Sequence, residues 1–388
     1  MRFLFFSAQY LPTVGGVERY TYNLCKTLIE KGHSCSVVTS ALPLLPAFEV
    51  SECIEIFRLP SRLFMDGRFP VIKKNKEFKR VAAEIFNRSY DFAVINTRFY
   101  SLSLFAARQC AAQDIPSIVI EHGTKHLSVD NHILDFFGNL YEHSAMWFIR
   151  RYCDSFFGVS KACCDWLDHF GVMTDKVLYN SVDSDEILLT VGSSVFNARE
   201  KFSIKKEVSL IVFSSRLIRE KGVFELLEAF DSCSEYFPDI ALILAGDGPL
   251  FDKIQARNAA NVFFAGRLTY SDNLALIKQA DIFILPTYSE GFSSVVLEAA
   301  VLEKCIITTP TGGSPELITH KKSGILLEDA SPDSIRKALI YCLDNKEFRV
   351  VAGTEIKKKV VESFSWKKTA DSLIKTAMSS KKETITDI

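Results

Sequence analysis

The stretch IFILPTYSEGFSSVVLEAA, residues 282–300, predicts a strand, a turn and a helix in immediate succession. Its first four residues form an uninterrupted apolar run that stops at Pro286, and such runs are typical of strands covered on both faces of a sheet. The turn TYSEG follows, and we expect a helix from Phe292 to Glu303 that packs its valines and leucine.

The same pattern recurs along the chain, where short apolar runs alternate with amphipathic segments. The runs lie at 3–6, 35–38, 53–57, 92–95, 117–120, 155–159, 176–179, 209–213, 241–245, 261–264, 282–285, 305–308 and 324–327. Strand and helix alternating this often predict an α/β fold with parallel sheets and crossover helices. Because 388 residues exceed one ordinary core, we expect two domains of this kind.

The domain boundary is predicted from composition. Residues 184–207 mix charge, serine and glycine without sustained periodicity, so we expect them to form a linker between domains at 1–183 and 208–364. Open α/β sheets bind ligands beyond the carboxyl ends of their strands, and a cleft between the domains is the expected site. The polar tail, 379–388, is expected to be disordered.

Composition excludes several classes of protein. A net charge of −1 gives no global field that would attract nucleic acid. The ten cysteines include no C-x-x-C pair, so we expect neither a zinc ribbon nor a redox motif, and a reducing compartment is the simplest context. The N-terminal apolar run is too short for a signal peptide, and no later run approaches the length of a membrane span. We expect a cytoplasmic protein that is at most peripheral to a membrane.

Two carboxylates frame the turn and helix of the opening stretch. Glu290 lies at the carboxyl edge of the strand, before a helix N-terminus that suits phosphate. Glu298 is expected about two turns into that helix, where it can accept hydrogen bonds from the vicinal hydroxyls of a ribose, as Glu290 can from a sugar ring. Taken alone, this spacing favours the simpler interpretation of a capping glutamate and a solvated one.

A second segment, FSSRLIREKGVFELLEAF at 213–230, adds two cations. Arg216 and Lys221 fall in the loop between a strand and its helix, at the carboxyl edge. Two cations in that place can neutralise a diphosphate without a metal and stabilise the charge that develops as phosphate leaves. The alternative is a pair of ordinary solvated loop cations.

The first half offers weaker signals. Gly15 and Gly16 precede a helix, but the loop is not a G-x-G-x-x-G fingerprint, which disfavours NAD. His122 ends the strand at 117–120 and could hydrogen-bond a transferring sugar. We interpret the neighbouring histidines as structural, namely His126, His132 and His143. The acidic DSD at 183–185 is interpreted as solvated, so we expect no metal.

Five features then occur in one order: the Gly-Gly loop, EHG (121–123), SSRLIREKG (214–222), AGDGP (245–249), and EGFSSVVLEA (290–299) with TGGSPELI (311–318) behind it. Together they resemble glycosyltransferase family 4, over nearly the whole chain and most specifically across 209–330. The resemblance implies the GT-B fold, with two Rossmann-like domains facing across a cleft. It also implies transfer of a sugar from a UDP- or GDP-linked donor with retention, with no cofactor or metal.

The resemblance also implies roles for individual residues. Arg216 and Lys221 would bind the donor diphosphate, and Glu298 would hold the donor ribose. Glu290, with the backbone of Gly291 and Phe292, would contact the donor sugar. His122 would lie near the transferred sugar, and Gly16 would border the diphosphate. A closing helix at 365–378 would cross back to the first domain.

Two positions depart from the family pattern. Ser181 replaces the usual glycine of an Asn-Gly-Val-Asp motif, so the turn there loses a residue that tolerates left-handed backbone. Ser293 stands where glycine is frequent. Neither change removes a charged site residue.

The acceptor side is the least specified. Residues 62–88 interleave basic residues with phenylalanines and could rest on an anionic membrane, although a solvated helix face over a buried phenylalanine stripe fits equally well. We expect a glycan or lipid-linked acceptor in bacterial surface polysaccharide assembly, such as O-antigen, capsule or lipopolysaccharide core. The alternatives are a nucleotide-sugar epimerase and a non-catalytic partner that binds nucleotide sugar.

Overall fold

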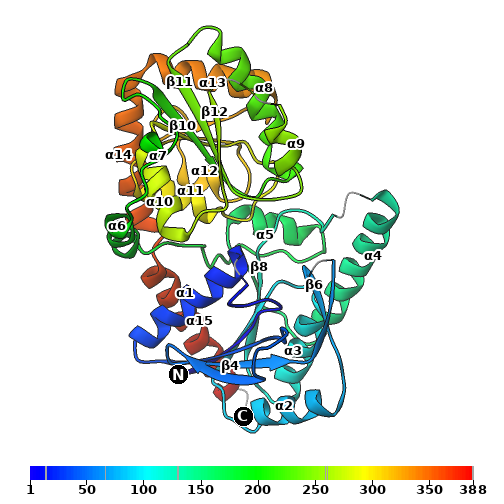
Figure 1. Ribbon diagram of the computed structural model, residues 1–388. Coiled ribbons are helices and arrows are strands. Elements are labelled where there is room, and N and C mark those ends of the chain that lie inside the picture. Colours follow the sequence, from blue (N-terminus) through cyan, green and yellow to red (C-terminus); the bar gives the residue numbers. More distant parts are fainter. Residues whose placement is uncertain (14, 66, 129–130, 258, 260, 387–388) are drawn as a thin grey trace. The chain divides into compact units, whose positions relative to one another are not determined.

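The computed structural model describes residues 1–386 except 14, 66, 129–130, 258 and 260. The chain divides into two compact units (Figure 1). Unit 1 comprises Met1–Asn180 together with the C-terminal segment from Trp366, and unit 2 comprises Ser181–Ser365. Each unit is an α/β structure with its own sheet, and each is described by itself below.

Unit 1 is built on a sheet with the strand order β3-β4-β2-β1-β7-β8-β9. The strands are β1 (Arg2–Phe6), β2 (Ser34–Ser40), β3 (Phe48–Ser51), β4 (Ile54–Leu59), β7 (Phe92–Asn96), β8 (Ser117–Glu121) and β9 (Phe156–Gly158). Only β3 pairs antiparallel among the described strands of this sheet. The central strands β1 and β7 are buried along nearly their whole length, which explains their uninterrupted apolar sequences.

The helices of unit 1 are α1 (Gly16–Glu30), α2 (Lys76–Phe86), α3 (Ser101–Ala112), α4 (His132–Ile149), α5 (Lys161–Asp168) and α15 (Trp366–Thr386). Two further strands, β5 (Ser61–Phe64) and β6 (Phe69–Ile72), form an antiparallel hairpin. Polar side chains cap several of these helices. Asn75 accepts a hydrogen bond from Phe78 N at the start of α2, and Ser160 accepts one from Cys163 N at the start of α5.

Unit 2 is built on a sheet of parallel strands with the order β12-β11-β10-β13-β14-β15. The strands are β10 (Ser209–Ser214), β11 (Ile240–Ala245), β12 (Val262–Gly266), β13 (Ile282–Leu285), β14 (Cys305–Thr308) and β15 (Ile325–Leu326). Its helices are α6 (Ser184–Ser193), α7 (Ala198–Lys201), the 3-10 turn η1 (Arg219–Lys221), α8 (Val223–Ser234), α9 (Phe251–Gln255), α10 (Tyr270–Gln279), α11 (Ser294–Val301), α12 (Ser314–Leu317), α13 (Pro332–Asp344) and α14 (Lys346–Ser363). The prediction of an α/β fold with parallel sheets is confirmed.

The expected linker at 184–207 is wrong, because this segment carries α6 and α7 and belongs to unit 2. Asp183 accepts hydrogen bonds from Asp185 N and Glu186 N, both at 3.0 Å, and so caps α6. Asn197 caps α7 in the same way. Helix α6 packs against α10 and α11, so tertiary contacts stabilise a sequence whose own periodicity is weak.

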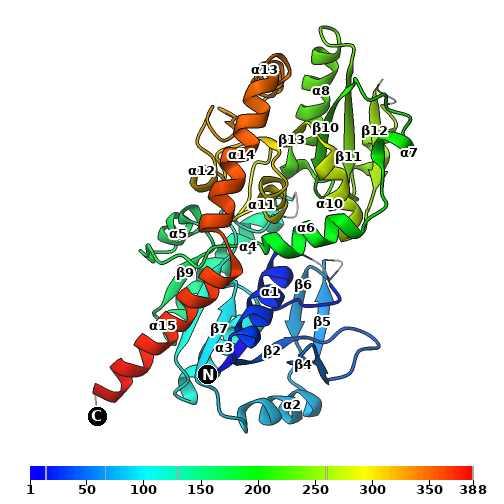
Figure 2. The same cartoon turned by 90° about the vertical axis from the view of Figure 1, so that its left-hand side faces the viewer.

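The C-terminal helix α15 packs against α1 of unit 1 (Figure 2). The Trp366 ring meets that of Tyr20 edge to face at 5.3 Å, and Lys31 Nζ lies 2.8 Å from Asp371 Oδ1. Helix α15 extends to Thr386 and so includes most of the segment from 379 that was expected to be disordered. The Ser379 and Ser380 hydroxyls donate to carbonyls four residues back, so these polar residues remain compatible with helix. Residues 387–388 lie outside the described chain.

One of the predicted strands does not form. The run at 176–179 forms only an isolated bridge, between Gly158 and Val177, instead of a strand. Within the described residues, no helix combines the length and the apolar character that crossing a membrane requires.

Candidate active site

The predicted donor residues of unit 2 lie at one edge of its sheet. Strand β10 lies between β11 and β13, and β14 follows β13. Because these strands are parallel, the loops at their carboxyl ends meet at the same edge. These loops carry Arg216 and Lys221 after β10, Glu290 after β13, and the Gly312-Gly313 pair after β14.

Glycines let these loops approach closely. Gly222 has a φ of 68°, and a Cβ added there would lie 2.1 Å from Pro286 O. Gly312 has a φ of 55°, and its Cβ would lie 2.3 Å from Gly291 O. A side chain at either position would therefore be strained in its backbone and would also collide with the neighbouring loop. The loops are further joined where Tyr288 N donates to Glu220 O at 2.8 Å.

The structure brings Lys221 and Glu290 into direct contact. Lys221 Nζ lies 2.5 Å from Glu290 Oε1 and 3.5 Å from Ser289 O. The two side chains are 14% and 21% exposed, so the pair is partly shielded and still open to an incoming ligand. Two residues that lie 69 positions apart in the sequence thus form one charged pair at the sheet edge.

Arg216 and Glu298 occupy different environments at this edge. Arg216 is exposed in the loop that also carries Lys221. Glu298 is 5% exposed and is the fifth residue of α11. The helix begins at Ser294, because Ser293 still has an extended backbone with a ψ of 117°, so Glu298 lies just over one turn into the helix instead of the expected two.

The two residues directly after Glu290 can face a ligand only through their backbone. The Phe292 side chain is 5% exposed and packs edge to face against Phe364 at 5.0 Å. Gly291 O accepts a hydrogen bond from Gly313 N at 2.9 Å. The Phe292 ring is thus part of the core, which leaves its peptide as the group that can face a ligand.

In unit 1, His122 directly follows β8 and has a fixed orientation. Its Nε2 lies 2.8 Å from Asn96 Oδ1, and its ring meets Tyr20 edge to face at 4.9 Å. Burial lowers the pKa of His122 to about 3, so the imidazole is neutral at pH 7. An amide oxygen only accepts, so Nε2 carries the proton and Nδ1 keeps a lone pair. His122 can therefore accept a hydrogen bond from a hydroxyl through Nδ1. Because the ring is neutral near pH 7, it cannot act as a general acid there.

Gly16 begins α1 and is exposed. The same helix holds the side chains that orient His122, because Thr21 Oγ1 accepts from Asn96 Nδ2 at 3.1 Å and Tyr20 packs on the imidazole. Gly16 follows β1 and His122 follows β8, so both lie at the edge of the unit 1 sheet formed by the carboxyl ends of these strands. Helix α1 begins at Gly16 and contacts His122 through Tyr20.

Sequence reasoning missed a buried charge network beside His122. Arg98 pairs with Glu121 and Glu142, and all three side chains are at most 3% exposed. Glu121 Oε1 also accepts from His122 N and Gly123 N, both at 3.0 Å, and so fixes the peptide that carries the imidazole. The sequence does carry one signal of this network, because Glu121 is a charged residue at the end of an apolar strand. Buried charges are rare unless they are paired, so such a residue indicates a buried partner of opposite charge.

Family models match both halves of the chain. Residues 14–186 match the model described as Glycosyltransferase Family 4, and residues 194–359 match the one described as Glycosyl transferases group 1.

Individual proteins resemble the chain over different lengths. An uncharacterized glycosyltransferase of Methanocaldococcus jannaschii is 26% identical over 95% of this chain and 96% of its own. A GDP-mannose-dependent monoacylated alpha-(1-6)-phosphatidylinositol monomannoside mannosyltransferase of Corynebacterium glutamicum is 29% identical over 43% of this chain and 46% of its own. Among solved structures, Anabaena Alr3699/HepE in complex with UDP-glucose matches with a TM-score of 0.75 at 18% identity, covering 98% of this chain and all of that one.

Proposed function

This chain belongs to the family 4 glycosyltransferases and has the GT-B fold, and from that premise we propose that it transfers a sugar from a UDP- or GDP-linked donor to a glycan or lipid-linked acceptor with retention of configuration. The observation that carries the proposal is the clustering of Lys221, Glu290 and Arg216 in neighbouring strand-end loops of unit 2, with Glu298 on the helix that follows.

Lys221 and Arg216 would bind the diphosphate. When the bond between the anomeric carbon and the phosphate oxygen breaks, its electrons stay on that oxygen, and the two cations stabilise the charge. The acceptor hydroxyl oxygen bonds to the anomeric carbon, and its proton passes to the departing phosphate oxygen. Because the cations supply the charge, we propose that transfer needs no metal. Since Lys221 is paired with Glu290, a bound diphosphate would compete with that carboxylate for the ammonium group.

The remaining residues would position the donor. Glu298 would accept hydrogen bonds from the ribose hydroxyls, and Glu290 would contact the sugar together with the backbone of Gly291 and Phe292. Gly16 would border the diphosphate through its backbone N–H at the start of α1. His122, which is neutral and held by Asn96, would accept from a hydroxyl of the transferred sugar through Nδ1. Catalysis in this scheme rests on positioning and charge stabilisation.

We place the reaction in bacterial surface polysaccharide assembly, such as O-antigen, capsule or lipopolysaccharide core, at the inner face of the cytoplasmic membrane. The resemblance to a mannosyltransferase named for a phosphatidylinositol mannoside supports a lipid-linked acceptor, and the likeness to a structure containing UDP-glucose supports a nucleotide-sugar donor.

The structure changes which residues could contact such a membrane. Within 62–88, of which residue 66 is not described, Phe78 is buried in the core of unit 1 and Phe86 packs against it, so α2 presents mainly its charges to solvent. The hairpin β5–β6 instead exposes Phe64 by 50%. Phe69 of that hairpin meets Tyr141 of α4 at 6.0 Å. Helix α4, which this contact places beside the hairpin, also exposes apolar residues, namely Ile133, Leu134, Phe136, Phe137 and Leu140.

We therefore expect this surface of hairpin and α4 to bind anionic vesicles, with Arg62, Arg68 and the lysines of 73–79 attracting the lipid headgroups. Replacing both Phe136 and Phe137 by serine should weaken vesicle binding about 10-fold or more, since each buried phenylalanine contributes about 1.5–3 kcal/mol. Co-sedimentation at low ionic strength measures the effect. Leu189→Ser, which changes an apolar residue of unit 2 that is even more exposed, is the control. Absence of binding by the wild type at low salt would contradict the proposal.

The transfer itself is tested by incubating the whole chain with UDP- and GDP-sugars, glycan or lipid-linked acceptors and EDTA. We expect nucleoside diphosphate and glycosylated acceptor in equal amounts, with no loss of rate in EDTA. An epimerase would convert the donor with no acceptor present. A non-catalytic partner would bind the donor, as measured by calorimetry, and form no product with any acceptor.

A further inference from the structure

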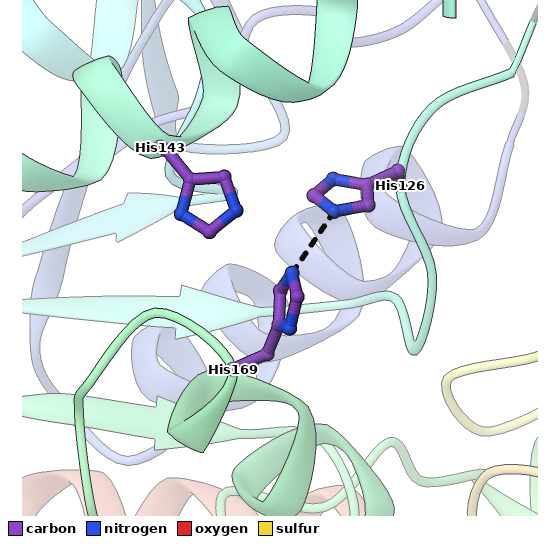
Figure 3. Close-up of side chains that lie close together, drawn as sticks. All are labelled: His126, His143 and His169. Atoms are coloured by element: carbon purple, nitrogen blue, oxygen red, sulfur yellow. Dashed lines mark hydrogen bonds between the residues drawn. The ribbon is translucent and has the colours of Figure 1, made fainter. Parts of the chain in front are cut away.

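Three histidines of unit 1 come together from separate segments (Figure 3). His126 lies in the segment after β8, His143 lies on α4, and His169 directly follows α5. One ring nitrogen from each of the three lies within 4.8 Å of those of the other two. The sequence alone predicts structural roles for His126 and His143 and gives no signal for His169.

The His126 ring is oriented so that one nitrogen faces the cluster. Its Nδ1 lies 3.0 Å from Glu142 Oε2, so Nδ1 donates to the carboxylate. Its Nε2 then faces His169 Nε2 at 3.1 Å. A histidine that donates one ring N–H to a carboxylate while its other nitrogen is free to coordinate is the usual arrangement around protein-bound metals, where the carboxylate fixes the tautomer.

Glu142 is itself held firmly. It is 3% exposed, accepts from Leu127 N at 2.8 Å and pairs with Arg98. Arg98 is shared with Glu121, so one guanidinium faces two buried carboxylates. This leaves one formal negative charge next to the histidines, which favours a bound cation.

The other two rings are accessible from solvent, and an aromatic side chain packs against each of them. His143 and His169 are exposed, so a metal ion can reach them. The Trp166 ring stacks on His169 at 4.8 Å with an angle of 8° between the planes. Phe170 meets the His126 and His143 rings at 5.6 and 4.7 Å.

The distance between the two Nε2 atoms also fits a hydrogen bond between neutral imidazoles. That alternative accounts for His126 and His169, but it gives no role to His143 or to the excess carboxylate charge. We propose that His126, His143 and His169 bind a transition-metal ion such as Zn²⁺, with three imidazole nitrogens as ligands and a fourth position open to water.

Such an ion would connect the segment after His122 to α4 and α5, all within unit 1. Its effect would be on the stability of unit 1, since the charges that the proposed transfer uses come from Arg216 and Lys221. Metal binding and metal-independent transfer can therefore both hold, and each is measured separately.

The test is a calorimetric titration of the chelator-treated, tag-free chain with ZnCl₂, followed by Co²⁺ absorption spectroscopy. We expect one tight site and the intense visible bands of four-coordinate cobalt. His143→Ala and His169→Ala should each weaken Zn²⁺ binding at least 10-fold, and both variants should fold because these side chains are exposed. His132→Ala, which removes an exposed histidine of the same helix, is the matched control.

Thermal unfolding gives a second readout. Zn²⁺ should raise the Tm of the wild type and of His132→Ala but not that of the two cluster variants, because an ion that binds only the native state stabilises it. The proposal is overturned if the wild type binds Zn²⁺ no more tightly than His143→Ala and His169→Ala, or if His132→Ala weakens binding as much as they do.

Discussion

Lys221→Ala is expected to lower kcat/KM for the donor by about 100- to 1000-fold, the usual cost of removing one group that stabilises transition-state charge. The variant loses the ammonium group that would face the leaving diphosphate. It also leaves Glu290, whose carboxylate lies 2.5 Å from Nζ, without that cation beside the incoming phosphates. Steady-state kinetics with a saturating acceptor measures the change.

A double-mutant cycle separates these two effects. If the carboxylate that has lost Lys221 repels the incoming phosphates, Glu290→Gln in the Lys221→Ala background should recover donor affinity relative to Lys221→Ala alone. Arg216→Ala should also reduce transfer strongly, whereas Lys206→Ala, an exposed lysine of the same unit, should leave it unchanged. Near-wild-type transfer by both Arg216→Ala and Lys221→Ala would show that these residues do not have the proposed roles.

Glu298→Gln is the second large effect that we expect. The substitution keeps the shape of a side chain that is only 5% exposed but removes its charge. Hydrogen bonds to a charged group contribute about 1.5–3 kcal/mol, so affinity for the nucleoside diphosphate should fall by about 10- to 100-fold. Isothermal titration calorimetry measures it directly.

A deoxyribose ligand provides the control for Glu298. The wild type should bind the 2′,3′-dideoxynucleoside diphosphate much more weakly than the ribonucleotide, whereas Glu298→Gln should bind the two with similar affinity. If the variant discriminates between them as well as the wild type does, Glu298 does not hold the ribose.

The parallel sheets and the strand-end loops could be predicted because they depend on local signals. The run 282–285 forms β13, and the segment at 215–222 places Lys221 at the edge of the sheet where the turn residue Glu290 also lies. The order of the strands follows from tertiary packing, so the contact between these two residues required coordinates.

Other features depend on partners far away in the sequence. Helix α6 has weak periodicity and is fixed by its Asp183 cap and by packing on α10. Arg98 carries no local signal of its buried pairing with Glu121 and Glu142, which come from β8 and α4. The histidine cluster was missed for the same reason, since His126, His143 and His169 meet only after folding.

The central claim is that Arg216, Lys221 and Glu298 of unit 2 bind one nucleoside diphosphate. A crystal structure of the whole chain with the nucleotide it binds most tightly tests this directly. We predict the diphosphate within hydrogen-bond distance of both cations, with the ribose hydroxyls on the Glu298 carboxylate and Lys221 Nζ shifted from Glu290 toward phosphate. A nucleotide bound elsewhere, with the Lys221–Glu290 pair undisturbed, would contradict the account.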